Sequence, residues 1–174
     1  MKSQAAGVYD EYVTGYVYTK YGGDDGNQII LNYCTEYAGV FAIESDGYAK
    51  GSYPSGLWID PAMIDRLFKL VSDPSYDDKD KIEFFERKYV CINVNKDDGI
   101  LILKNKMVVG ADGQPIKGGA VIYRYGKDAI GVATYNEANK FEDHGVEKTQ
   151  GIPSCQFGLD NFKNYLLDNG CIEE

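Results

Sequence analysis

Four short runs of alternating apolar and polar residues occupy the middle of the chain, between Lys88 and Tyr135. This period of two predicts β-strands, because successive side chains of a strand point to opposite faces of a sheet. Turn-forming residues separate the runs at Asp97-Asp98-Gly99, at Gly110 to Pro115 and at Gly126-Lys127-Asp128. The pattern therefore predicts a four-stranded antiparallel meander, with strands at 89–95, 100–104, 120–125 and 129–135.

The two faces of the third predicted strand differ in the apolar side chains that they carry. Its two faces consist of Val121, Tyr123 and Tyr125 against Ala120, Ile122 and Arg124. We expect one face of the sheet to be drier than the other, as in antiparallel sheets with one solvated side. The dry face then needs a cover of helices.

The clearest helix signal begins at Asp60, which can cap a helix whose first position is Pro61. A stripe at helical spacing follows and ends before Asp73-Pro74; it consists of Met63, Ile64, Leu67, Phe68 and Val71. The charged segment from Ser75 to Lys81 is either a short solvated helix or a surface loop. The run at 82–85 then leads into the meander.

The two ends of the chain carry further apolar stripes. Leu159, Phe162, Tyr165 and Leu166 predict a C-terminal helix that stops at Gly170. The N-terminal stripe has helical spacing, but tyrosine, valine and threonine are also the best strand formers, so helix and strand both remain open for it. This stripe consists of Tyr9, Tyr12, Val13, Tyr16 and Val17.

Two more strands are expected, at 28–33 and at 40–44, which gives an α+β order of elements in a single domain of residues 1–174. We expect residues 1–6 to be a loose N-terminus. The segments 72–81 and 136–154 are expected to be long loops, and loops of that size are often functional.

Charge and composition exclude several classes of function. A net charge of −9 argues against nucleic acid as the partner, because clustered Lys and Arg supply phosphate binding. Four dispersed cysteines and a single histidine, His144, make a metal site improbable and predict reduced thiols. No apolar run is long enough to span a bilayer and no signal peptide is evident, so we expect a cytoplasmic protein that is not transmembrane.

Catalysis finds little support in the sequence. There is no Gly-rich phosphate loop and no Ser or Cys in a nucleophile motif, and one histidine offers little for acid–base chemistry. We therefore expect a protein that is not an enzyme and needs no cofactor.

Five motifs follow one another in a particular order from about Val8 to Cys171. They are Tyr9-Asp-Glu-Tyr12-Val13, Val40 to Gly47, Ile59 to Ile64, Lys88 to Ile92 with the hairpin ending at Lys106, and Ala120 through Glu137 and Cys155 to Gly170. In order and spacing this set resembles the profilins, small cytosolic actin-binding proteins. The long loops suggest a divergent member, for example an archaeal, protist or viral one.

The resemblance implies a fold and a partner. It implies an antiparallel sheet of about six to seven strands, with the N- and C-terminal helices packed on one face and shorter helices on the other. On this basis 8–17 should be helical. The implied partner is an actin monomer, whose polymerisation and nucleotide exchange the family regulates. The residues carried over to the actin-binding surface are Lys88, Asn93, Lys104, Lys106, Asn136, Glu137 and His144.

A second family property is the binding of proline-rich peptides on an aromatic floor. Tyr9, Tyr12 and Tyr165 are the residues that match it here. Three departures weaken the match. Lys50 stands where the family has a Trp after Asp-Gly, Tyr9 replaces the family's first Trp, and Cys171 replaces a terminal aromatic or large apolar residue. The same tyrosines would alternatively serve only to pack the two terminal helices together.

A third property, phosphoinositide binding, is opposed by the excess of acidic residues and leaves only a local cluster of Lys104, Lys106 and Lys117 as a candidate patch. The rival hypothesis is an acidic α+β interaction module, such as an immunity protein or a nucleic-acid-mimic inhibitor. Acidic runs at 77–80 and 142–143 favour it. The rival requires a continuous acidic face, whereas a profilin should carry mixed charge around Lys88, Lys104 and Lys106.

Overall fold

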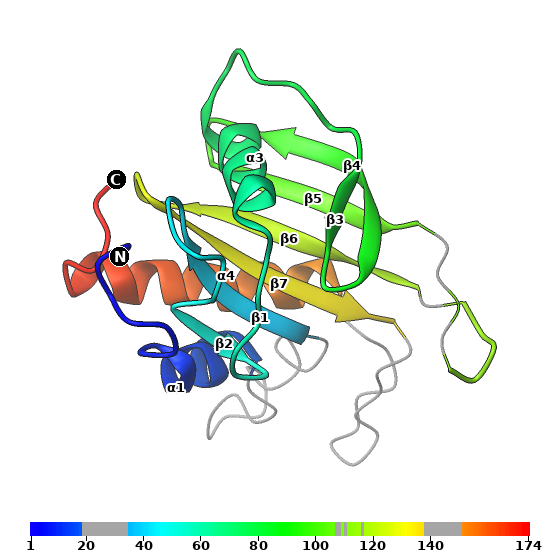
Figure 1. The fold of residues 1–174 in the computed structure, drawn as a ribbon, viewed down its shortest axis with the longest axis horizontal. Coiled ribbons are helices and arrows are strands. Elements are labelled where there is room, and N and C mark those ends of the chain that lie inside the picture. Colours follow the sequence, from blue (N-terminus) through cyan, green and yellow to red (C-terminus); the bar gives the residue numbers. More distant parts are fainter. Residues whose placement is uncertain (19–34, 107–108, 110, 116, 138–150) are drawn as a thin grey trace.

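The predicted meander forms the centre of the sheet in the computed structural model (Figure 1). The structure describes residues 1–18, 35–106, 109, 111–115, 117–137 and 151–174. The predicted strand at 28–33 and His144 lie outside these residues, as does most of the predicted loop at 136–154.

Seven antiparallel strands form one sheet in the order β2-β1-β7-β6-β5-β4-β3. The meander strands β4 to β7 are neighbours, and β6 and β7 pair without a register shift from Gly118–Asn136 to Tyr125–Ala129. The strands are Thr35–Ala42 (β1), Gly51–Tyr53 (β2), Ile82–Phe84 (β3), Arg87–Asn95 (β4), Ile100–Asn105 (β5), Gly118–Tyr125 (β6) and Ala129–Asn136 (β7). The α+β sheet with terminal helices is thus confirmed.

The helix α3, Pro61–Ser72, begins and ends where the sequence predicts. The Asp60 carboxylate accepts a hydrogen bond from the Ala62 N–H at 2.9 Å, and Pro61 occupies the first position. Of the two alternatives for the segment after it, the loop is correct. The Arg66 guanidinium donates to the carbonyl of Lys81 at 3.2 Å, so a side chain of α3 holds this loop against the helix.

The N-terminal stripe is helical, and the strand alternative is wrong. It forms α1, Asp10–Val13, and a π-helical turn η1, Thr14–Tyr18. Val13 and Val17 are buried against α4, Ile152–Asp168. A Cβ at Gly158 of α4 would lie 2.9 Å from the Cα of Val17, so the glycine permits this close packing. Tertiary burial therefore overrides the strand propensity of Tyr and Val.

Helices cover both faces of the sheet at β6 and β7, so the expectation of one drier face fails for this part of the sheet, whereas β4 keeps an exposed face. Figure 1 shows α3 in front of the sheet and α4 behind it. The side chains of Val121 and Tyr123 join the core under α1, η1 and α4, while Ala120 and Ile122 join a second core under α3. The sheet is thus the middle layer of three.

Residues 2–6, which the sequence predicts to be a loose end, are exposed, but hydrogen bonds connect this segment to the domain. The Lys50 ammonium donates to the Gln4 carbonyl at 2.8 Å, and the Gly7 N–H donates to the Ala49 carbonyl at 3.1 Å. Met1 packs against the core below α4. The boundary of the loop predicted at 136–154 also moves, because α4 already begins at Ile152.

Candidate functional site

The two terminal helices bring four tyrosines together, and we call Tyr9, Tyr12, Tyr16 and Tyr165 the tyrosine cluster. The first lies just before α1, the second in α1, the third in η1 and the last in α4. Helical spacing places the three N-terminal rings on one side of their segment. All three tyrosines that the family resemblance singled out are therefore neighbours.

The rings of the cluster are in mutual contact. Tyr165 stacks on Tyr12 with centroids 5.0 Å apart and an interplanar angle of 23°, and its centroid lies 5.2 Å from that of Tyr16. Phe162 lies beneath them, parallel to Tyr165 within 9° at 6.1 Å. Tyr9 closes the cluster edge-on to Tyr12 at 6.3 Å. Contacts of this kind fix the ring positions before any ligand binds.

The cluster is partly open to solvent and stays uncharged. Tyr12 is 43% exposed, Tyr165 is half-buried and Tyr9 is buried. A hydrogen bond with the Tyr12 side chain is the main reason that the pKa of Tyr165 rises to about 12. Burial, followed by a hydrogen bond with Cys171, raises the pKa of Tyr9 to about 12. The surface is thus a neutral aromatic one at physiological pH, which suits an apolar, rigid ligand.

Two of the three sequence departures, Lys50 and Cys171, have clear structural consequences. Lys50 is only 7% exposed and is a structural residue, because its ammonium holds the Gln4 carbonyl. Cys171 is a free, half-buried thiol beside Tyr9. Tyr16, which the sequence placed only in the apolar stripe, supplies a further ring. Its position one helical turn after Tyr12 was the signal for it.

A second surface lies on the half of the sheet that α4 leaves bare. The helix packs mainly on β6 and β7. On β4 and β5, the register places Val90 opposite Lys104 and Asn93 opposite Ile102. Ile102 in turn pairs with Val121, whose side chain lies under α4, so these residues share the face of α4. We call Lys88, Val90, Ile92, Asn93, Ile102, Lys104 and the adjoining Lys106, whose N–H bonds to the Lys88 carbonyl, the open face.

The open face combines apolar and basic side chains. Val90 is 40% and Ile92 is 56% exposed. A register shift between Cys91 and Asn93 turns Ile92 outward as the extra residue of a bulge. Contiguous exposed apolar residues with a polar rim are typical of protein-binding sites. Lys88 and Lys104 are exposed beside them.

Most of the remaining residues carried over from the family lie at one end of the same strands. The Lys106 N–H donates to the Lys88 carbonyl at 2.9 Å, and the Glu137 N–H donates to the Lys117 carbonyl at 2.7 Å. The Asn136 amide donates to the Glu36 carboxylate at 3.3 Å, which gives it a structural partner. Asn93 lies further along β4, and His144 falls outside the described residues.

Comparison with known proteins was made for both sequence and structure. No protein-family model matches the sequence, and no curated protein does. The structure is similar to mouse profilin IIa, solved in complex with a double repeat from the FH1 domain of mDia1, with a TM-score of 0.52, 15% identity and coverage of 79% of this chain and 89% of that chain. Rat profilin 2a gives a TM-score of 0.53, 15% identity and coverage of 79% and 88%.

The chain has the profilin fold. At 15% identity the likeness concerns the fold alone. Within the described part of this profilin fold, no group of three or more His, Cys, Asp or Glu side chains is arranged to hold a metal ion. None of the described helices is long and apolar enough to cross a bilayer.

Proposed function

We propose that this protein binds monomeric actin through the open face and thereby regulates actin polymerisation. One observation carries the proposal. In a chain with the profilin fold and a net charge of −9, the bare half of the sheet exposes Val90 and Ile92 beside Lys88 and Lys104. Apolar residues framed by cations are suited to a large partner of opposite charge, since cations steer encounter and apolar residues supply affinity.

Charge at this end of the sheet supports actin over the rival acidic module. Lys88, Lys104 and Lys106 are exposed and lie near one another, because Lys106 bonds to the Lys88 backbone. A nucleic-acid mimic would need carboxylates in a continuous array there. Glu137 beside Lys117 makes the charge mixed, which also weighs against a phosphoinositide patch at the cluster of Lys104, Lys106 and Lys117.

The test is spontaneous assembly of pyrene-labelled actin, taken from the source organism and from muscle. The wild-type protein should slow assembly of at least one of these actins. Lys104→Glu with Lys106→Glu should abolish the effect, because two like charges then face the acidic partner. The matched control, Lys2→Glu with Lys127→Glu, changes the net charge equally at exposed positions outside the open face and should behave like wild type. No effect of the folded wild-type protein on either actin would refute the proposal.

A second activity, binding of proline-rich segments, is favoured by the tyrosine cluster. Polyproline II segments are rigid and pack well on preformed aromatic rings. One of the similar structures contains an FH1 repeat, and in this chain four tyrosines are already in ring contact between the terminal helices. The two activities would let one molecule hold an actin monomer and a proline-rich protein together in the cytoplasm.

A further inference from the structure

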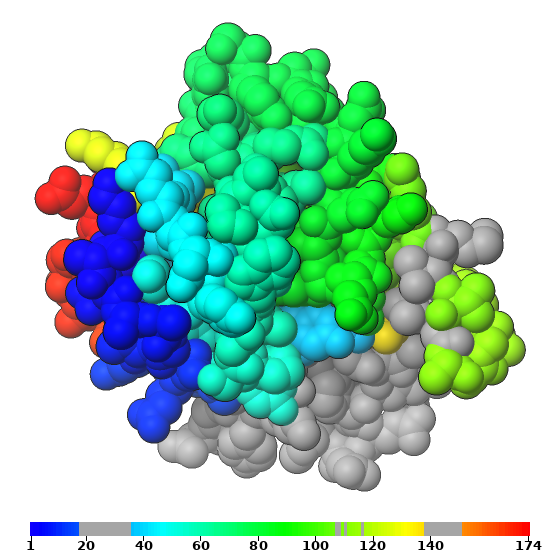
Figure 2. Space-filling view, in the orientation of Figure 1, coloured from blue at the N-terminus to red at the C-terminus, as the bar shows by residue number. Residues whose placement is uncertain are grey.

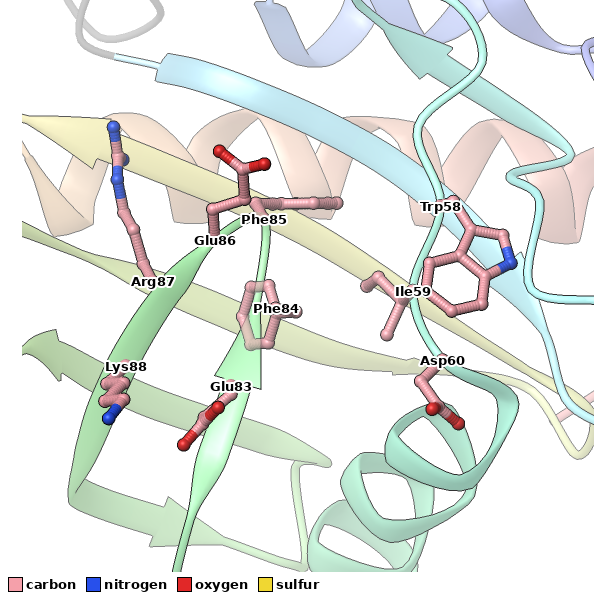
Figure 3. A pocket seen from close by; sticks show the side chains of 9 residues that line it. All are labelled: Trp58, Ile59, Asp60, Glu83, Phe84, Phe85, Glu86, Arg87 and Lys88. Carbon is pink, nitrogen blue, oxygen red and sulfur yellow. The ribbon is translucent and has the colours of Figure 1, made fainter.

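A groove of about 590 Å³ lies apart from the tyrosine cluster and shares only Lys88 with the open face. The hairpin of β3 and β4 forms one side, and the segment from Trp58 to Asp60 forms the other (Figure 3). In the space-filling view, β1 is visible in light blue between the green hairpin and the teal segment (Figure 2). Nothing in the sequence pattern predicts this groove, because its two sides come from segments that the chain brings together only in the fold.

The walls of the groove are aromatic and firmly placed. The indole N–H of Trp58 donates to the Asp46 carbonyl at 2.9 Å, and Figure 3 shows the six-membered ring directed toward Ile59 and the hairpin. Trp58 is nevertheless 47% exposed. Opposite it, Phe85 packs on Phe84 at 5.2 Å and on Tyr37 at 5.6 Å. An exposed tryptophan face held in this way is a good platform for a flat cation.

The groove runs along the free edge of the sheet. β3 is the last strand in the order, and it pairs through Ile82–Tyr89, Glu83–Lys88 and Phe84–Arg87. Phe84 and Arg87 close the tight turn and form a hydrogen-bonded pair. Hydrogen-bonded and non-hydrogen-bonded pairs alternate in an antiparallel ladder, so Glu83 and Lys88 form a non-hydrogen-bonded pair. The backbone N–H and C=O of Glu83 therefore point away from β4 and toward the groove. Among the residues that the structure describes, no backbone group bonds to this outer edge.

The opposite edge of the sheet is protected by comparison. The Ser52 N–H of β2 donates to the Asp10 carboxylate at 2.8 Å, and the Tyr9 N–H donates to the Lys50 carbonyl at 2.8 Å. Proteins usually cover or charge their edge strands because a bare edge recruits another strand. The edge of β3 is therefore the one at which the described sheet can be extended.

The charged side chains around the groove indicate which kind of ligand it can bind. Arg87 is tied to Glu36 in an ion pair and lies over the Tyr37 ring, so its cation is compensated. Lys88 and Glu83 are cross-strand partners on the opposite face of the hairpin from Phe84, so their charges offset each other. Glu86 makes no ion pair with any other described residue, and the Asp60 carboxylate lies at the far side. The uncompensated charge around the groove is thus negative.

The geometry points to a binding site for an extended, arginine-bearing peptide, which adds to β3 as a further strand at this edge of the described sheet. The peptide backbone bonds to the N–H and C=O of Glu83, as in other cases of β-strand addition. Arginine stems lie on Trp58 and Phe85, and the guanidinium groups reach Glu86 and Asp60, since arginine both stacks on aromatic rings and pairs with carboxylates.

Trp58 is the single tryptophan of the chain, so its fluorescence reports on this groove directly. The probe is a short amidated peptide of alternating valine and arginine flanked by serine. It should cause a saturable change in Trp58 emission and slow hydrogen exchange at the Glu83 amide. Citrulline in place of arginine, or methylation of alternate backbone amides, should weaken binding about tenfold each, the loss expected for charge-assisted or backbone hydrogen bonds.

Two variants locate the site. Glu86→Gln removes one carboxylate, and Glu83→Pro removes the outward N–H while leaving the bonds to β4; both should weaken binding about tenfold. Asp97→Asn, at an exposed position in the β4–β5 turn, is the control and should bind like wild type.

Three results would overturn the proposal. The first is the absence of any saturable Trp58 signal at roughly millimolar peptide. The second is equal binding of the arginine and citrulline peptides, or of the wild type and both groove variants, after circular dichroism has shown these to be folded. The third is a Trp58 signal that depends on protein concentration without peptide, which would assign the groove to a second copy of the chain.

Discussion

Tyr12 is the residue on which the properties of the tyrosine cluster depend most directly. It is the most exposed ring among those assigned by resemblance, and its hydroxyl bonds to Tyr165. Tyr12→Ala should weaken binding of a proline-rich peptide by about tenfold, because a stacking surface is lost. Tyr48→Ala removes a tyrosine of similar exposure outside the cluster and should have no effect. Equal losses in the two variants would contradict the assignment.

The same residue permits a test by titration. In Tyr12→Phe the hydrogen bond is lost but the ring remains, so the pKa of Tyr165 should fall from about 12 toward 10.0. Carbon-13 NMR of labelled tyrosine measures this value. A raised pKa favours the neutral phenol in the folded state, so its contribution to stability is present below pH 10 and is lost as the pH rises through 12. An unchanged pKa in the variant would show that the hydrogen bond is not its cause.

Glu86 is strained in its backbone. It has a φ of 60° and follows Phe85 with a φ of 53°, in a turn where glycine or asparagine is usual. Glu86→Gly should raise the free energy of unfolding by about 0.5–1 kcal/mol, since relief of the left-handed strain exceeds the added entropy of the unfolded chain. Urea unfolding measures it. Glu86→Ala keeps the Cβ and should give no gain, so a gain in both variants would point to the lost charge.

At the scale of elements, the contact between the terminal helices depends on one small residue. A Cβ at Gly158 would meet the backbone of Val17, whereas a Cβ at Gly15 would meet nothing within 4 Å. Gly158→Ala should therefore destabilise the protein by about 1–3 kcal/mol and separate the tyrosines. Gly15→Ala should stabilise it by about 0.5–1 kcal/mol. Thermal unfolding checks both signs, and a stable Gly158→Ala protein would contradict this packing.

Periodicity predicted correctly the elements whose own sequence carries a clear apolar pattern. The stripe and cap of α3 and the alternation of β4 to β7 specify their own structure, because each carries its apolar residues at one period. The N-terminal segment had the right spacing but an opposing propensity, and only its burial against α4 decides for a helix. The strand β1 runs from Thr35 to Ala42, whereas the sequence placed it at 40–44. Its extra residues pair with β7, a partner far away in the chain.

At the scale of the whole molecule, the arrangement of helices on both faces of the sheet was predicted only from the family resemblance, and not from the residue pattern itself. The pattern of the third meander strand suggested one solvated side, yet helices cover both sides of β6 and β7. The open face follows from this arrangement, because α4 covers only half of its side of the sheet. The pairing of Lys88 with Lys106, and the groove beside β3, likewise depend on strand order. Neither is encoded in local spacing.

The central claim is that monomeric actin binds the open face, and lysine footprinting tests it most directly. Acylation of each lysine by an amine-reactive reagent is measured by mass spectrometry with and without saturating actin monomer. Lys88, Lys104 and Lys106 should lose reactivity several-fold, while Lys2 and Lys127, which are exposed elsewhere, should react as before. Unchanged reactivity of the first three lysines in a complex known to have formed would contradict the account.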